Sequence, residues 1–285
     1  MVDRLDVVFC VPNLTQRFCS PYVKSMQETQ WLLGSVGIKS GIRVVPSDCF
    51  VDKARNRLWT DFIDDNPECP NMFFIDDDIG WEPAKVVEFI RRPDPVVAGV
   101  YPKKSKMRDF PCSFMVNPEN GKLIESQGMV RAVLAPTGFM RIKRDVVIML
   151  AARASKMKEA QPEGGFKFAH YVFESGRGPD DQYWGEDYTF CKKLEELGIP
   201  IWVDPHITFE HMGTHVWIDR VADHLGLFRA RADKIWRGEV NEHGMPIPDE
   251  NIPAELPVVV PPFDNPDDGQ GYGDGDVVPF TVAAE

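Results

Sequence analysis

The chain has 285 residues, 44 of them acidic and 32 basic, and a formal net charge of −12. This length accommodates one large α/β domain or two small ones. No stretch approaches the roughly 20 apolar residues of a membrane-spanning helix, and the apolar run at 7–11 is too short for a signal peptide, so we expect no membrane segment. The six scattered cysteines form no C-x-x-C pair, which is typical of a reduced, cytoplasmic protein.

The charge is unevenly distributed along the chain. Residues 239–285 contain 11 acidic residues, no Lys or Arg, and many prolines and glycines. We interpret this segment as an extended or disordered acidic tail that follows a folded domain at 1–238. The domain itself is nearly neutral and has basic clusters at 103–108 and 229–237, so the overall acidity does not exclude a polyanionic partner.

The first hundred residues alternate between strand and helix patterns. We expect strands at 6–11, 42–45, 72–75 and 96–101, and helices at 21–36, 52–62 and 83–90, with Ser20 as the N-cap of the first helix. This alternation favours a doubly wound α/β sheet, in which ligands bind beyond the carboxyl ends of the strands.

The remainder is richer in strands. A turn at 117–121 is expected to join strands at 113–116 and 122–125, and further strands are expected at 129–134, 139–143 and 201–204. Helices are predicted at 144–157 and 186–197, and a last long helix at 216–236.

Three consecutive carboxylates, Asp76, Asp77 and Asp78, follow the apolar strand at 72–75. Adjacent carboxylates repel one another, so placing them where a buried strand surfaces is costly unless a cation neutralises them. Hard oxygen ligands suit Mn²⁺ or Mg²⁺, particularly when a substrate adds phosphate oxygens. The alternative is a solvated acidic turn. A calcium loop is disfavoured, because its twelfth position would be Val87 instead of a bidentate Glu.

Two later motifs carry ionisable side chains. Glu186 and Asp187 follow a glycine at the start of a predicted helix, where they either complement the helix dipole or supply a general base. His211 and His215 flank Gly213 and are interpreted as metal or phosphate contacts, the alternative being ordinary structural histidines. No H-E-x-x-H is present, which excludes a zincin helix.

The order of these motifs resembles the GT-A class of nucleotide-sugar glycosyltransferases, and within it family 2. The resemblance spans 7–217 and rests on the D-x-D at 76–78, the pair at 186–187, the H-x-G at 211–213, and the segments 54–56 and 136–140. It implies a GT-A fold at 1–238, with a mostly parallel central sheet and a smaller acceptor-side sheet.

The resemblance also implies roles for single residues. Asp78, Asp76 and His211 would hold Mn²⁺ or Mg²⁺, although the triple acid leaves open which two carboxylates bind. Asp187 would be the catalytic base of an inverting enzyme, with Glu186 beside it, whereas a retaining enzyme needs no such base. The nucleoside-diphosphate sugar, expected to be UDP-linked, would contact Arg55 through its diphosphate, Asp48 through its base, and further residues at Pro12, Asp76, Asp77 and His215.

The acceptor is the least determined part of this reading. Its expected contacts are Tyr101, Lys103, Lys104, Thr137, Gly138 and Trp184. One hypothesis is hydroxymethylated pyrimidine in phage DNA, in the cytoplasm of a bacterial or phage-infected cell. Trp184 or Tyr101 would then stack on the flipped base, and lysines 103, 104 and 106 would contact the phosphates. The competing acceptors are a surface glycan, a lipid-linked sugar or a protein side chain. A metal-dependent nucleotidyltransferase and a non-catalytic nucleotide-sugar-binding module are alternatives from other classes, and the sequence indicates neither the sugar nor the oligomeric state.

Overall fold

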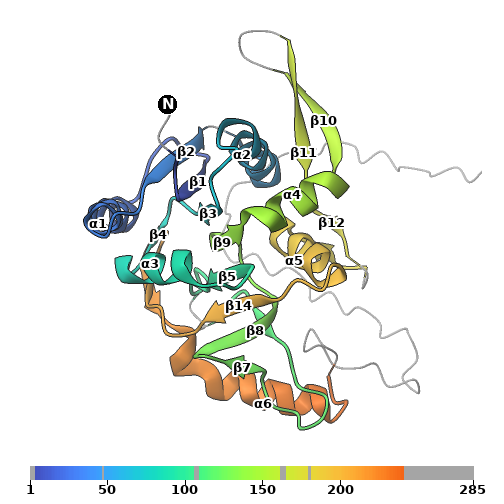
Figure 1. The fold of residues 1–285 in the computed structure, drawn as a ribbon. Coiled ribbons are helices and arrows are strands. Elements are labelled where there is room, and N and C mark those ends of the chain that lie inside the picture. Colours follow the sequence, from blue (N-terminus) through green and yellow to red (C-terminus); the bar gives the residue numbers. More distant parts are fainter. Residues whose placement is uncertain (1–3, 47, 106–108, 161–164, 179–180, 241–285) are drawn as a thin grey trace, which may run out of the picture. The chain divides into compact units, whose positions relative to one another are not determined.

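The structure is a computed structural model that describes residues 4–46, 48–105, 109–160, 165–178 and 181–240 (Figure 1). These residues belong to one compact unit. The expected acidic tail lies outside the described residues except for Glu239 and Val240, so its boundary and its extended character stay predictions.

A nine-stranded sheet forms the centre of the fold. Its strands are β1 (Val7–Asn13), β2 (Ser40–Pro46), β3 (Asn71–Ile75), β5 (Val96–Gly99), β6 (Ser113–Phe114), β7 (Glu125–Ser126), β8 (Met129–Leu134), β9 (Phe139–Lys143) and β14 (Ile201–Asp204). Their order is β2-β1-β3-β9-β5-β14-β8-β6, with β7 paired to β8. Strands β1, β2, β3, β5 and β14 run in one direction, while β9 and β8 run against their neighbours. The predicted fold class, α/β with a mostly parallel central sheet, is confirmed.

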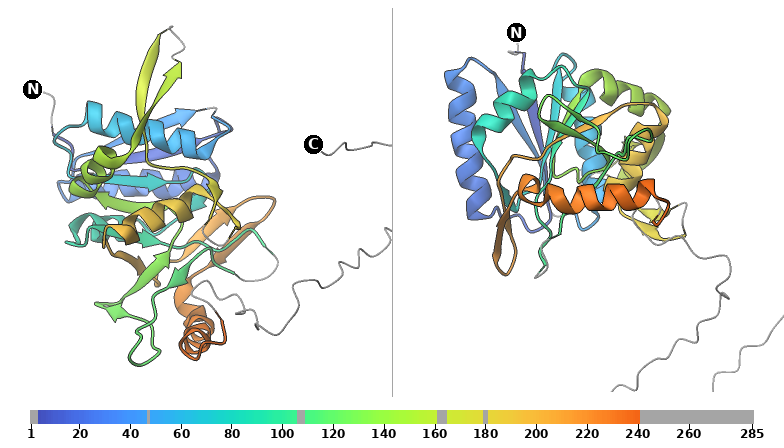
Figure 2. Two further views of the ribbon diagram at one scale, coloured as in Figure 1. Left: turned by 90° about the vertical axis from the view of Figure 1, so that its right-hand side faces the viewer. Right: turned by 90° about the horizontal axis from the view of Figure 1, so that it is seen from below.

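Helices cover both faces of this sheet, as expected for a doubly wound fold (Figures 1 and 2). The helices are α1 (Ser20–Ser35), α2 (Val51–Asp65), α3 (Pro83–Arg91), α4 (Arg144–Arg153), α5 (Glu186–Glu196) and α6 (Leu225–Trp236). Trp59, Leu150 and Phe190 bury α2, α4 and α5 in one core cluster, and Leu33 and Phe89 bury α1 and α3 in another. No helix in the described part of the chain is both long and apolar enough to span a membrane.

Strand β3 explains the position of the acidic triplet. All five of its residues are buried, because it lies between β1 and β9 and beneath helices on both faces. A strand this apolar cannot shift its register without exposing core residues. The residues that follow it therefore emerge at a fixed point on the carboxyl edge of the sheet.

A smaller sheet lies directly beyond the triplet. It consists of β4 (Ile79–Gly80), β15 (Phe209–Met212) and β16 (Val216–Asp219), in the order β16-β15-β4. His211 is in register with Ile79, and the N–H of Met212 donates to the carbonyl of Asp78 at 2.8 Å. This pairing fixes β15, and with it His211, against the end of the acidic motif.

The predicted helix at 216–236 is wrong over its first half. Residues Val216–Asp219 form β16, a short 3₁₀ turn follows at Val221–His224, and the helix begins only at Leu225. The apolar positions of 216–219 also suit a strand, and pairing with β15 decides the outcome. Sheet pairing with a distant segment overrides a local helical pattern here.

The helix predicted at 144–157 also ends early, at Arg153. Residues Ser155–Ala160 form β10, which pairs with β11 (Phe166–Tyr171) in a hairpin that projects from the central sheet (Figures 1 and 2). A second hairpin joins β12 (Gly176–Arg177) and β13 (Tyr183–Trp184). The N-cap of α1 is Cys19 rather than Ser20, since its sulfur accepts from the N–H of Tyr22 at 3.4 Å.

The predicted strand pair at 113–116 and 122–125 forms differently. β6 and β7 both pair with β8, and a single bridge joins Val116 to Leu123 across the turn. Strand β8 has six residues against two in each of the others, so it offers both of them a longer partner than they offer each other.

Candidate active site

The acidic triplet begins where β3 leaves the sheet. The N–H of Asp76 donates to the carbonyl of Gly138 at 2.8 Å, which extends the pairing of β3 with β9 by one residue. One oxygen of the Asp76 carboxylate accepts from Arg55 Nη2 at 3.3 Å, and the other accepts from the hydroxyl of Tyr101 at 2.9 Å. Asp76 is thus held by the sheet, by helix α2 and by the segment after β5.

Arg55 is the centre of a cluster of charges. Its side chain is only 3% exposed, and besides Asp76 it contacts Glu186 (Nε to Oε1, 3.4 Å) and Asp187 (Nη2 to Oδ1, 3.8 Å) at the start of α5. Burial alone lowers the pKa of Arg55, but the three carboxylates outweigh burial and raise it above its usual range. Its Nε and Nη1 are buried, and neither has a hydrogen-bond partner among the described residues, so the contact of Nε with Glu186 is an ion pair only. Arg55 therefore joins three carboxylates and still carries two nitrogens whose N–H groups have no acceptor.

Negative charge exceeds positive charge at this edge of the sheet. Burial and neighbouring carboxylates raise the pKa of Asp76 and of Glu186, although Arg55 lowers both. Burial, followed by Asp78 and Asp76, raises the pKa of Asp77 to about 6. Crowded carboxylates retain protons more readily than isolated ones, and a ligand that brings positive charge relieves their repulsion.

Asp187 is oriented by donors from the loop before β9. The N–H of Thr137 donates to Asp187 Oδ1 at 3.2 Å, and the hydroxyl of Thr137 donates to the same oxygen. Arg55 approaches this oxygen as well, while a quarter of the Asp187 side chain stays exposed. A fixed, ionisable and partly exposed carboxylate is suited to accept a proton from a bound substrate.

Asp78 lies opposite a histidine and a lysine. The ammonium group of Lys104 contacts Asp78 Oδ2, and His211 Nε2 lies 3.7 Å from Oδ1. Burial raises the pKa of Asp78, but the bonds from His211 and Lys104 outweigh it, so the net shift is downward. The Nδ1 of His211 is 2.6 Å from the carbonyl of Pro102. A carbonyl can only accept, so Nδ1 carries a proton; Nε2 can then donate to Asp78 when the ring is protonated and offers a lone pair when the ring is neutral.

This donor set fits a divalent cation in part. A histidine that binds a metal usually donates its second ring nitrogen to a carbonyl or carboxylate, as His211 does to Pro102. Asp78 and His211 are thus suited to be neighbouring ligands. Both oxygens of Asp76 are already engaged, and within the described residues no three His, Cys, Asp or Glu side chains are grouped to hold a metal. Mn²⁺ or Mg²⁺ at this place would need further oxygens from substrate or water.

A cavity of about 180 Å³ opens beside the triplet. Its lining comprises the three carboxylates, Arg55, Pro12 at the end of β1, and Asp48, Cys49 and Val51 at the start of α2, together with Leu14. Asp48 is largely buried and pairs with Lys53 at 3.1 Å. Most residues that the sequence assigned to the nucleotide sugar therefore line one cavity. His215 does not line it, because it lies exposed in the turn between β15 and β16.

Two residues that the sequence assigned to acceptor binding, Tyr101 and Gly138, instead lie against Asp76. Tyr101 is 7% exposed and its hydroxyl holds Asp76, which does not fit the predicted stacking on an acceptor ring. At Gly138, a Cβ would lie 2.0 Å from Asp76 Oδ2 and 2.3 Å from the Tyr101 hydroxyl. Gly138 is required for the close approach of β9 to these side chains.

Lys103 and Trp184 line a second cavity, of about 370 Å³. Its walls also include Tyr183, Tyr188 and Arg231, none of which was predicted as a site residue, although Arg231 belongs to the basic cluster at 229–237. The two tyrosines adjoin the motif at 184–187 and could have been noticed for that reason. Nothing in the sequence connects Arg231 with that motif.

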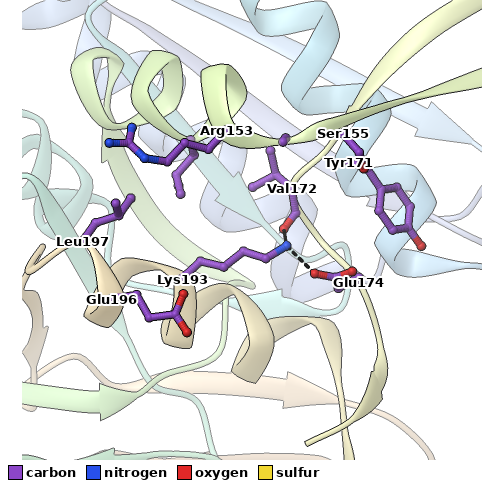
Figure 3. A pocket seen from close by; sticks show the side chains of 10 residues that line it. Arg153, Ser155, Tyr171, Val172, Glu174, Lys193, Glu196 and Leu197 are labelled. Carbon is purple, nitrogen blue, oxygen red and sulfur yellow. Dashed lines mark hydrogen bonds and ion pairs between the residues drawn. The ribbon is translucent and has the colours of Figure 1, made fainter.

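A third cavity, of about 290 Å³, is formed by α4, β11 and the C-terminal half of α5 (Figure 3). Lys193 in its wall donates to the carbonyl of Val172 at 2.7 Å and pairs with Glu174 at 2.6 Å. Its ammonium group is thus already satisfied, and the residues that line this cavity include none of the Arg55 cluster. We assign no chemistry to it.

Comparisons with known proteins identify similar folds only. No family model and no curated protein matches the sequence. Similar solved structures include A197 from STIV, with a TM-score of 0.44 and 14% identity over 73% of this chain and 86% of that chain. They also include a glycosyltransferase involved in the glycosylation of the major capsid of PBCV-1, with a TM-score of 0.31 and 10% identity over 50% of this chain and 62% of that chain. Both scores are too low to indicate a function, which has to be inferred from the site.

Proposed function

We propose that this protein is a glycosyltransferase that moves a sugar from a nucleoside-diphosphate sugar to an acceptor hydroxyl, with the help of Mn²⁺ or Mg²⁺. The main support is the cavity at the carboxyl edge of β3, where a buried arginine with an unpaired donor lies among carboxylates. A diphosphate supplies the hydrogen-bond acceptors and the oxygen ligands that this cavity lacks. Its oxygens can accept from Arg55 Nη1 and can complete the coordination of a cation held by Asp78 and His211.

The lining of the cavity suits the two ends of such a donor. Asp48 and Pro12 lie towards α2 and β1, where a nucleoside would fit, and the acidic triplet lies at the diphosphate end. A bound cation would stabilise the charge that develops on the departing diphosphate. Arg55 would contribute positive charge at the same point, while its contacts with Glu186 and Asp187 hold α5 against the donor.

Asp187 is assigned the role of the base that takes the proton of the acceptor hydroxyl. As the acceptor oxygen bonds to the anomeric carbon, the bond from that carbon to the diphosphate breaks, and the hydroxyl proton passes to the Asp187 carboxylate. Thr137 and Arg55 fix this carboxylate through Oδ1, which leaves Oδ2 to take the proton. The raised pKa of Glu186 makes it a second group able to hold a proton close by.

Calorimetry with UDP tests the donor site. We expect binding in Mn²⁺, loss of binding in EDTA, and loss in Asp78→Ala, while Asp145→Ala, an exposed acidic residue of α4, binds as the wild type does. Equal affinity with and without metal would contradict the role of Asp78 and His211. A protein that binds no nucleoside diphosphate at all would contradict the proposed donor. Exchange of pyrophosphate into nucleoside triphosphates would instead indicate a nucleotidyltransferase.

A further inference from the structure

The second cavity adjoins the proposed catalytic groups through two pairs of consecutive residues. Tyr188 lines this cavity and follows Asp187, the proposed base. Lys103 lines it and precedes Lys104, whose ammonium group contacts Asp78. Asp187 in turn contacts Arg55, and both Arg55 and Asp78 line the cavity of the triplet, so residues next to those that line the second cavity contact residues that line the first.

Aromatic rings form much of this second cavity. Phe110, Tyr183, Trp184 and Tyr188 line it, and the rings of Trp184 and Tyr188 are perpendicular, with centroids 6.4 Å apart. Tyr183 is 79% exposed and Trp184 is buried, so one ring stands at the opening and the other inside. Ligand cavities commonly combine aromatic walls with a few polar groups that fix orientation.

Two hydrogen-bonding atoms in its wall have no partner. Ser113 Oγ and Arg231 Nε are buried and unpaired among the described residues, although both residues line the cavity. The Ser113 residue is 7% exposed. Buried polar atoms are almost always hydrogen-bonded in native proteins, so an unpaired hydroxyl and an unpaired guanidinium N–H just behind the surface of one cavity are donors and acceptors that a small side-chain shift would offer to a polar ligand.

The charges in the cavity distinguish between ligands. Lys103 and Asp109 both line it and pair with each other at 2.5 Å, so the lysine charge is compensated within the cavity. A phosphate would be attracted by Arg231 and repelled by Asp109. Sugar hydroxyls both donate and accept, so a sugar that carries several of them can pair with an ammonium group, a carboxylate, a serine hydroxyl and a guanidinium. The aromatic walls can face the apolar side of a sugar ring.

We propose that this cavity is the acceptor site and that it binds an uncharged carbohydrate rather than a nucleic acid. The assignment as an acceptor site rests on the proposed glycosyltransferase function, whereas the binding of a sugar does not. Of the acceptors considered for this chain, a glycan fits the cavity best. The hydroxyl to be glycosylated would point from the ring towards Asp187.

Binding can be measured without the donor. Saturation-transfer NMR with the methyl glycosides of glucose, galactose, mannose and N-acetylglucosamine is expected to show contact with at least one of them. Tyr183→Ala removes the exposed ring and Arg231→Gln removes the unpaired donor, and each is expected to weaken binding roughly tenfold. Trp31→Ala, an exposed aromatic on α1, and Arg229→Gln, on the same helix as Arg231 but paired with Glu125, are the matched controls and should bind normally.

The outcomes separate this inference from the proposed function. UDP binding by calorimetry is measured on the same variants and should be unchanged. The protein could bind sugar in a way that depends on Tyr183 and Arg231 and yet bind no UDP. This result would support the carbohydrate site and contradict the proposed transferase function. UDP binding together with no saturation transfer from any sugar, or with equal transfer in all variants, would refute the carbohydrate site. Binding of only a duplex containing 5-hydroxymethylcytosine, followed by fluorescence anisotropy, would refute it in favour of DNA.

Discussion

Replacement of Arg55 by Met tests the charge cluster most directly. Methionine preserves an unbranched apolar side chain beside Phe74, over whose ring the guanidinium lies at 5.7 Å, but leaves Asp76, Glu186 and Asp187 without their shared cation. Removing one partner of a buried ion pair typically costs about 3–5 kcal/mol. We expect Arg55→Met to lose stability in this range near neutral pH.

The loss of stability in Arg55→Met should depend on pH. Burial already raises the pKa of Asp76 and Glu186 while Arg55 lowers it, so both pKa values rise further in the variant. A carboxylate whose folded pKa exceeds its unfolded value contributes stability that is complete below the unfolded pKa, about 4, and lost as the pH rises through the folded pKa. The deficit of Arg55→Met is therefore expected to be small at about pH 4 and complete near pH 8.

Urea denaturation followed by tryptophan fluorescence, in EDTA at both pH values, measures this difference. Arg57→Met is the control, because Arg57 lies on the same helix, is partly exposed and pairs with Glu159 at 3.5 Å. Its expected loss is at most about 1 kcal/mol. A loss of less than about 1 kcal/mol for Arg55→Met near pH 8, or an equal loss at both pH values, would refute the idea that Arg55 compensates buried carboxylates.

Three further predictions concern catalysis, packing and domain organisation. Asp187→Asn keeps the shape of the base but cannot accept a proton, so UDP affinity should survive while turnover falls by roughly 10²–10⁴-fold; wild-type turnover would indicate another base or a retaining mechanism. Gly138→Ala places a methyl group against Asp76 and Tyr101, so UDP affinity should fall although the protein remains folded by circular dichroism, and unaltered affinity would contradict the close approach. Truncation after Gly238 should leave a folded protein that binds UDP; insoluble protein would show that the tail is structural.

The sequence predicted the first half of the fold well. Strands β1, β2, β3 and β5 and helices α1–α3 lie within a few residues of their expected positions, because each is a separate apolar run between polar turns. Residues 155–157 and 216–219 were assigned to helices, because a short stretch of sequence gives no information on their pairing with β11 and β15. β4, with two residues, is too short to show any period.

The sequence identified many residues of the candidate site but not the contacts that they make with one another. Asp76, Arg55 and Asp187 were selected as separate contacts for a donor and a base, whereas the structure joins them in one cluster. Tyr101 was expected to stack at the surface, because an aromatic after a strand gives no indication of depth. Arg231 was noted only as part of a basic cluster, because it reaches the second cavity from α6, far along the chain from the motifs that define the site.

Two neighbouring lysines have a consequence for how each substrate affects the binding of the other. Lys104 contacts Asp78 in the first cavity, while Lys103 pairs with Asp109 in the second, and one peptide bond joins them. A ligand that displaces Lys104 from Asp78 also perturbs the backbone that carries Lys103. The affinities of the two cavities are then coupled, and thermodynamic linkage requires the coupling to be equal in both directions. Initial-rate kinetics with both substrates varied would show it as an apparent acceptor KM that changes with donor concentration.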